Sequence, residues 1–118
     1  MSDPIRVFFN PSCSKCRGAR EMLDARGASV TYIHYLDTPP TREDIEVVMG
    51  ALGIESPRAM MRTKESLYGE LQLGDADDEA LMQAMLAHPV LIERPIVIRG
   101  SRAVIARPPE KLEALFRD

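Results

Sequence analysis

The stretch IRVFFNPSCSKCRGAR, residues 5–20, decides how the chain can fold. Ile5 to Phe9 form a short run of β-favouring residues, and the Asn-Pro-Ser cluster that follows favours a turn. From Ser14 the apolar residues recur with the period of a helix. Two cysteines, Cys13 and Cys16, lie where the turn meets this helix. The stretch therefore predicts a strand, a tight turn and a helix, with both thiols at the start of the helix.

A second β-favouring run, Val30 to Tyr35, follows the helix, which is predicted to end at Gly27. This order predicts a β-α-β unit, and a right-handed crossover places its two strands parallel in one sheet. In such a unit the end of the first strand and the start of the helix meet, here at residues 11–16. We expect a functional site at this junction.

The middle of the chain, about residues 41–92, is predicted to be all helical, because capping residues and helical apolar spacing recur through it. The predicted segments run from Thr41 to Gly53, Ser56 to Arg62, Lys64 to Leu71 and Asp77 to His88. A β-hairpin of Ile96–Ile98 with Ala103–Ala106 follows, and Pro108 starts a last helix. The fold class is therefore α/β. A β-α-β unit, an inserted all-helical segment and a β-β-α unit form one domain over residues 1–118.

The composition is that of an ordinary globular domain. The chain has 118 residues, of which 45% are hydrophobic and 28% charged, and this disfavours both disorder and a fibrous repeat. Its formal net charge of -3 disfavours direct nucleic-acid binding, which calls for a basic excess. No apolar run approaches the roughly 20 residues that span a bilayer, and residues 1–6 carry no apolar signal core. We therefore expect a cytoplasmic protein without a membrane partner.

The two cysteines are the chemically distinctive residues. The chain has only two cysteines, and its two histidines follow no zinc-finger spacing, so neither a disulfide framework nor a metal site is expected. Unpaired N–H groups and the helix dipole stabilise a thiolate at a helix start, and Lys15 and Arg17 add positive potential. Cys13 is therefore the predicted nucleophile. Cys16 lies one turn further along, where it is either an inert core residue or a resolving thiol.

Arginines supply the second candidate feature. The guanidinium fork suits tetrahedral oxyanions, and Arg62, Arg94 and Arg107 each occupy a marked local setting. Because a single arginine is usually a surface residue, an anion site depends on their convergence on Cys13. The Arg94-Pro95 bond, at the start of a predicted strand, is the candidate cis peptide. A phosphatase-type loop is disfavoured, since it would need an arginine where the chain has Ala19.

Taken together, these residues resemble the glutaredoxin-coupled arsenate reductase family over nearly the whole chain. The matching segments are Asn10 to Arg17, Arg62, Glu93 to Val97 and Arg107 to Glu110. The resemblance implies a thioredoxin-like sheet with a helical insertion, and a reaction in which the Cys13 thiolate attacks arsenate to form a thioarsenate adduct. Arg62, Arg94 and Arg107 match the family's anion-binding arginines. It also implies that glutathione attacks the adduct and that glutaredoxin resolves the mixed disulfide, with no bound metal or nucleotide cofactor.

Two positions depart from the family's pattern. Phe9 stands where well-studied members have a histidine, so the helix terminus must activate the thiol alone. Cys16 stands where members commonly have serine, which permits an internal disulfide and makes thioredoxin an alternative reductant. A second branch of the superfamily, redox-sensing regulators that bind RNA polymerase, also has Cys-x-x-Cys but lacks the Arg107–Glu110 segment. An arsenate reductase is thus the leading hypothesis. A regulator with a Cys13–Cys16 disulfide switch and a thiol-disulfide oxidoreductase of another substrate are the alternatives.

Overall fold

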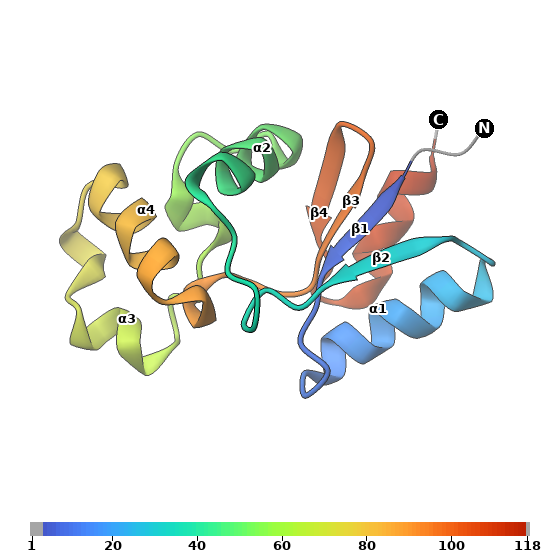
Figure 1. Cartoon of the computed structure of the whole chain (residues 1–118), viewed down its shortest axis with the longest axis horizontal. Helices are drawn as coiled ribbons and strands as arrows, with labels where there is room; N and C mark the ends of the chain where they lie inside the picture. Colours follow the sequence, from blue (N-terminus) through green and yellow to red (C-terminus); the bar gives the residue numbers. More distant parts are fainter. Residues whose placement is uncertain (1–3, 118) are drawn as a thin grey trace.

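The computed structural model describes residues 4–117, and its centre is a four-stranded sheet (Figure 1). The strands are β1 (Ile5–Phe8), β2 (Val30–Ile33), β3 (Ile96–Arg99) and β4 (Arg102–Ile105), in the order β2-β1-β3-β4. β1 is parallel to β2 and antiparallel to β3, which is antiparallel to β4. The predicted β-α-β unit and the β-hairpin are thus both confirmed, and they meet where β1 pairs with β3.

Each face of the sheet carries its own core, because neighbouring strand residues point to opposite faces. Ile5 and Val7 belong to one buried cluster, together with Val97, whereas Phe8 and Ile96 belong to the other. On the first face pack helix α1 (Ser14–Ala25) and the C-terminal 3-10 helix η4 (Pro109–Phe116). α1 lies against this face because its apolar positions recur at helical spacing, and its buried residues are Cys16, Ala19 and Leu23.

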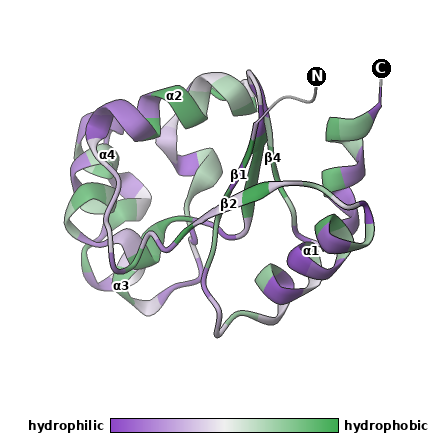
Figure 2. Cartoon of the chain, turned by 45° about the vertical axis from the view of Figure 1, so that its right-hand side comes forward, coloured by the Kyte–Doolittle hydropathy of each residue, from purple (hydrophilic) through white to green (hydrophobic). Residues whose placement is uncertain are grey.

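The second face is covered by the helical insertion, which forms the lobe on the left of Figure 1. Its α-helices are α2 (Arg42–Leu52), α3 (Ser66–Glu70) and α4 (Asp78–Ala87). Short 3-10 turns connect them: η1 (Pro57–Met60), η2 (Leu73–Asp75) and η3 (Pro89–Leu91). In Figure 2 hydrophilic and hydrophobic residues are interspersed along both α1 and α2, as expected for helices that bury one face against a core. The sheet is therefore the middle layer between two helical layers.

Capping residues mark the ends of the insertion helices as the sequence predicts. Thr41 and Asp44 form a capping box at the start of α2, and Gly53 ends this helix with φ +72°. At the start of α4 the Asp77 side chain accepts a hydrogen bond from Ala80 N. These caps satisfy N–H and C=O groups that a helix leaves free at its ends, so the boundaries of α2 and α4 are fixed locally.

Several elements differ from the prediction in their bounds or geometry. The helix predicted from Ser56 to Arg62 ends at Met60, because Met61 leaves the helix to form an isolated β-bridge with Ile92. The helix predicted from Lys64 to Leu71 is confined to α3, and the last helix has 3-10 rather than α geometry. The predicted cis peptide at Arg94-Pro95 is present, and Arg107-Pro108 is a second one that the sequence analysis did not predict.

Candidate active site

Cys13 occupies the N-cap position of α1, immediately before the first helical residue. Its backbone is extended, with φ -94° and ψ 123°, and its side chain makes no capping hydrogen bond to the helix. The turn before it is closed by Cys13 N, which donates to Asn10 O over 3.0 Å, and by Ser12 N, which donates to Asn10 Oδ1 over 3.0 Å. The Asn-Pro-Ser sequence thus fixes the thiol at the mouth of the helix, where N–H groups are free to face a thiolate.

The environment of Cys13 favours the thiolate. Burial of the side chain disfavours the charged form, but the backbone N–H of Cys16 and the Arg94 guanidinium outweigh it and lower the pKa of Cys13 from 9.0 to about 7. The lowered pKa increases the share of the nucleophilic thiolate at neutral pH. Phe9 in place of a histidine does not prevent activation, because the helix start and the arginine supply the stabilisation.

Cys16 has the opposite character. Its side chain is fully buried in the core beside Ala19 and Leu23. Burial raises the pKa of Cys16 to about 11, although Asn10 N donates a hydrogen bond of 3.4 Å to its sulfur. Both cysteines are free thiols. Cys16 is therefore a packed, protonated core residue in this state, and Cys13 carries the reactivity of the pair.

Arg94 and Arg107 reach Cys13 from the open end of the β3–β4 hairpin. Arg107 Nη1 donates a hydrogen bond of 3.8 Å to Cys13 Sγ and another of 2.9 Å to Arg94 O. Burial lowers the pKa of Arg94, but the nearby Cys13 thiol reverses this and raises it above the ordinary value. The two arginines are 13 residues apart, yet they are neighbours because Ala106 N donates to Pro95 O over 2.9 Å and closes the hairpin base. Both arginines therefore converge on Cys13, which is the condition that an anion site requires.

Arg62 reaches the same region from the helical insertion. Arg62 N donates to Leu91 O over 2.7 Å, and Glu93 N donates to Met60 O over 2.9 Å, so the two segments are held together on either side of the Met61–Ile92 bridge. Arg62 Nη1 lies 3.5 Å from Glu93 Oε1. With Arg107, Arg62 lines a cavity of about 260 Å³. Arg62 is therefore connected to the thiol through this cavity and Arg107.

Sequence reasoning gave no role to three residues: Glu65 and Glu93, which line this cavity, and Tyr35, which lies near Arg94. Glu65 and Glu93 are the two carboxylates paired with Arg62, at 3.6 Å from Nε and 3.5 Å from Nη1. Tyr35 is fully buried, its hydroxyl has no hydrogen-bond partner among residues 4–117, and burial raises its pKa. Arg94 also influences the Tyr35 pKa, which places the phenol near that guanidinium. Local patterns cannot reveal Glu93 and Tyr35, because their contacts join segments far apart in the chain, whereas the three-residue spacing of Arg62 and Glu65 could have indicated their pairing.

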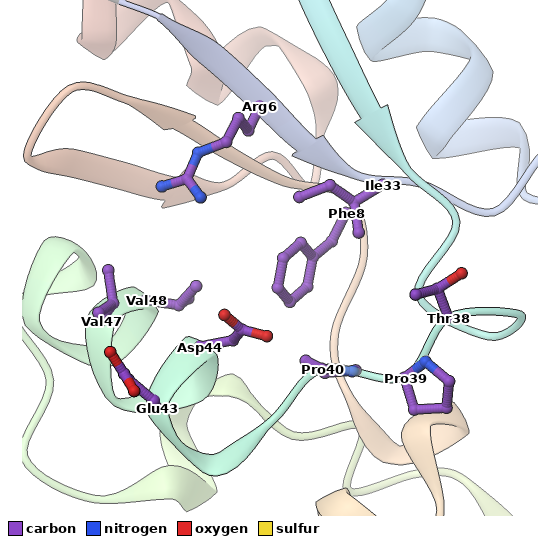
Figure 3. A pocket seen from close by; sticks show the side chains of 10 residues that line it. All are labelled: Arg6, Phe8, Ile33, Thr38, Pro39, Pro40, Glu43, Asp44, Val47 and Val48. Carbon is purple, nitrogen blue, oxygen red and sulfur yellow. The ribbon is translucent and has the colours of Figure 1, made fainter.

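A second cavity, of about 220 Å³, lies on the insertion side of the sheet (Figure 3). Figure 3 shows the Phe8 ring and the Val48 side chain beside its polar residues, Arg6, Glu43 and Asp44. Asp44 serves the α2 capping box there. Neither cysteine lines this cavity, since both belong to the core on the other face. Within residues 4–117 no cluster of histidine, cysteine and acidic residues could hold a metal ion, and no helix could cross a membrane.

A reactive cysteine at the start of the first helix, on a sheet built from β-α-β and β-β-α units, defines a thioredoxin-like thiol protein. Within this class, a sequence model of the ArsC family matches residues 8–115. The chain therefore belongs to the ArsC family, and the family resemblance seen in the sequence is confirmed.

Individual relatives agree with this assignment. The chain is 43% identical over 114 residues to a protein of Neisseria meningitidis named arsenate reductase, covering 95% of this chain and 97% of that one. It is 38% identical over 116 residues to the arsenate reductase of Escherichia coli, covering 97% and 82% of the two chains. A solved structure described as arsenate reductase from Vibrio cholerae matches with a TM-score of 0.92 and 42% identity, over 97% of this chain and 98% of that one.

Proposed function

We propose that this chain is a thiol-dependent oxidoreductase that reduces arsenate to arsenite. The observation that carries the proposal is the Cys13 thiol itself. Its pKa is about 7, and Arg107, which donates a hydrogen bond to its sulfur, also lines a cavity with the cations Arg62 and Lys64 and the carboxylates Glu65 and Glu93. The names of the relatives in Neisseria, Escherichia and Vibrio support arsenate as the substrate.

In the proposed reaction the Cys13 thiolate attacks the arsenic atom of arsenate. A sulfur–arsenic bond forms, an arsenic–oxygen bond breaks, and the departing oxygen leaves as water after taking up protons. A second thiol then attacks the Cys13 sulfur. The sulfur–arsenic bond breaks with its electron pair on arsenic, so arsenic(V) becomes arsenic(III) while two thiols become one disulfide. No bound metal or nucleotide is needed, because the thiols supply both electrons.

The three arginines would hold the oxyanion during the attack. Arg94 and Arg107 are beside the sulfur, so they would bind the oxygens that gain negative charge when the sulfur–arsenic bond forms. Arg62, on the other side of the 260 Å³ cavity, would complete the binding of the anion. Substrate binding thus takes residues from both the hairpin and the helical insertion.

The proposed second thiol is glutathione, with glutaredoxin resolving the mixed disulfide. Cys16 is the internal alternative, but its buried, protonated thiol is a poor attacking group until the site rearranges. If Cys16 resolves the adduct, the product is a Cys13–Cys16 disulfide and thioredoxin is the better electron donor. Either reductant is consistent with a cytoplasmic protein, since the cytosol keeps thiols reduced.

The test is arsenate-dependent oxidation of NADPH in two coupled systems, glutathione with glutaredoxin and thioredoxin with its reductase. We expect Cys13→Ser to abolish turnover and Cys16→Ser to retain it with glutaredoxin. Loss of turnover in both variants, with a preference for thioredoxin, would instead make Cys16 the resolving thiol. Unchanged turnover in Cys13→Ser would refute the proposed nucleophile.

A redox regulator is the second candidate function, and the contact between the two thiols favours it. A side-chain hydrogen bond with Cys16 lowers the pKa of Cys13, which makes these neighbouring sulfurs the pair that a disulfide would join. Such a disulfide could switch docking to a partner such as RNA polymerase. A pull-down from reduced and oxidised lysates tests this candidate. The regulator hypothesis requires partners that bind only one redox state of the protein. Partners that bind both states equally would count against this hypothesis.

A further inference from the structure

Glu93 is the residue beside the anion cavity to which neither the sequence pattern nor the proposed reaction gives a role. It directly precedes Arg94, and its side chain is about one-quarter exposed. Its backbone is held by the hydrogen bond from Glu93 N to Met60 O. The carboxylate lines the cavity together with Arg62 and Arg107, and Oε1 lies 3.5 Å from Arg62 Nη1. A carboxylate is thus held within a site otherwise suited to anions.

This placement is unfavourable for a simple anion site. The cavity is lined by the cations Arg62, Lys64 and Arg107 and by the carboxylates Glu65 and Glu93. An ionised carboxylate can only accept hydrogen bonds, so it repels an oxyanion whose oxygens are all unprotonated. An oxyanion that still carries a hydroxyl group can instead donate its proton to the carboxylate. The same residue then attracts one class of anion and repels another.

From this we infer that Glu93 selects oxyanions that carry a proton at neutral pH, by accepting a hydrogen bond from their hydroxyl group. Arsenate and phosphate retain such a hydroxyl, whereas sulfate has none. A site whose polar group pairs with a substrate hydroxyl discriminates against the analogue that lacks this hydroxyl. The inference rests on the proposed function, because it assumes that the oxyanion binds in the cavity that Glu93 shares with Arg107, the arginine that donates to the Cys13 sulfur.

The geometry assigns this selection to Glu93 rather than to Glu65. Glu93 precedes Arg94, the arginine that stabilises the Cys13 thiolate, so its backbone is tied to the site of attack. Glu65 lies three residues after Arg62 and pairs with Nε at 3.6 Å. Both carboxylates neutralise Arg62 to a similar degree by distance. Glu65 is therefore a matched control: if loss of a carboxylate changed selectivity only by leaving the charge of Arg62 less neutralised, Glu65→Gln and Glu93→Gln would have the same effect.

The test is protection of Cys13 from alkylation by iodoacetamide at pH 7, with inorganic phosphate or sulfate as the probe and the labelled cysteine identified by mass spectrometry. In the wild-type protein we expect phosphate to protect at a concentration at least about tenfold lower than sulfate. Glu93→Gln keeps the shape of the side chain and removes its charge. We expect this variant to bind sulfate better. The phosphate-to-sulfate ratio, meaning the factor by which the protective concentration of sulfate exceeds that of phosphate, should then fall to about threefold or less.

Glu65→Gln should leave the phosphate-to-sulfate ratio as in the wild type. A wild-type ratio near one, an unchanged ratio in Glu93→Gln, or an equal change in Glu65→Gln would each overturn the inference. Should Glu93→Gln fail to fold, Glu93→Asp retains the charge but draws the carboxylate back by one methylene group, and the ratio should fall by part of the same amount. An unchanged ratio in Glu93→Asp would then count against the inference.

The protection assay also separates this inference from the proposed function, because neither probe is reduced. Selectivity without any arsenate-dependent turnover would leave the role of Glu93 standing and refute arsenate reduction. Turnover of arsenate with no preference for phosphate over sulfate would refute the role of Glu93 and leave arsenate reduction standing. The two claims therefore fail on different measurements made on the same variants.

Discussion

The two ends of the candidate site are built in different ways. The thiol end is local: the turn, Cys13 and the start of α1 all come from residues 10–17, joined by hydrogen bonds within that segment. The arginine end is assembled over long distances, because Arg107 is 94 residues away from Cys13 and Arg62 enters from the insertion. Thiol activation thus depends on the local segment and on Arg94, whereas anion binding also needs Arg62 and Arg107 from distant parts of the fold, so mutations outside residues 10–17 and Arg94 should be able to separate the two.

The largest expected effect comes from the arginine end. Arg107→Ala removes the donor that lies 3.8 Å from the Cys13 sulfur. Because this group faces the oxygens on which charge develops, we expect arsenate-dependent kcat/KM to fall by about 10² to 10³-fold. Steady-state kinetics with glutathione and glutaredoxin measures this loss. Arg6→Ala is the control, since Arg6 lines the other cavity, on the insertion side of the sheet, and its kcat/KM should stay near the wild-type value.

The two cores offer the next contrast. Leu23 of α1 and Leu81 of α4 are both fully buried, one in each core cluster. Truncation of either to alanine removes a similar apolar volume, so we expect each to lower the free energy of unfolding by about 2–5 kcal/mol, measured by urea denaturation. In the folded variants, Leu81→Ala should raise KM for arsenate and leave the Cys13 pKa unchanged.

Leu23→Ala should do the reverse, because the helix that activates the thiol packs through Leu23. We expect it to raise the pKa of Cys13 more than it raises KM. Equal effects of both truncations on KM and on the pKa would show that the two ends of the site respond as one unit, and the comparison would then fail.

A pH titration of alkylation tests the activation of the Cys13 thiol. The rate for Cys13 should rise with a midpoint at about pH 7, while Cys16, whose pKa is about 11, should react little below pH 9. Arg94 stabilises the thiolate, so its removal must move the Cys13 midpoint upward, towards 9.0. For Arg94→Gln we expect a several-fold lower rate at pH 7 and a recovered rate at high pH. A midpoint that did not rise would assign the activation to the helix start only.

The same division explains how much could be predicted from the sequence. The strand–turn–helix stretch carries its own signals, namely β-favouring residues, the Asn-Pro-Ser turn and helical spacing, so it predicts Cys13 as a nucleophile at a helix start. The capped ends of α2 and α4 were predictable for the same reason, since caps are local. Arg62, Arg94 and Arg107 could be named from sequence, but their convergence could not be derived from local patterns.

Long-range pairing accounts for what the sequence did not predict. The Met61–Ile92 bridge ends the helix predicted to reach Arg62, and the partner strand lies 31 residues away. Glu93 was noticed only as part of a family segment, because its pairing with Arg62 depends on that bridge. The burial of Cys16 follows from the packing of α1 against the sheet, which local patterns do not determine, and whether Cys16 also resolves the adduct stays a prediction.

The smallest expected effect concerns the contact that joins the two ends. A Cβ added at Gly18, in α1, would lie 3.0 Å from Cγ of Pro109, at the start of η4. Pro109 follows Arg107 by two residues, so an alanine at position 18 must push this segment away from α1. We expect Gly18→Ala to lower arsenate kcat/KM by about two- to fivefold, since small shifts of positioned groups slow catalysis. The Cys13 titration should stay within error of the wild type.

Gly50→Ala provides the matched control for that substitution. Gly50 also lies within a helix, α2, but nothing stands within 4 Å of the position that its Cβ would take. Alanine there should raise the free energy of unfolding by about 0.5–1 kcal/mol through helix propensity, with unchanged kinetics. In Gly18→Ala the same gain is offset by the displaced proline, so its stability should stay near the wild type. A kinetic loss shared by both variants would point to helix propensity, whereas a loss in Gly18→Ala alone would locate the coupling between thiol and arginine at Pro109.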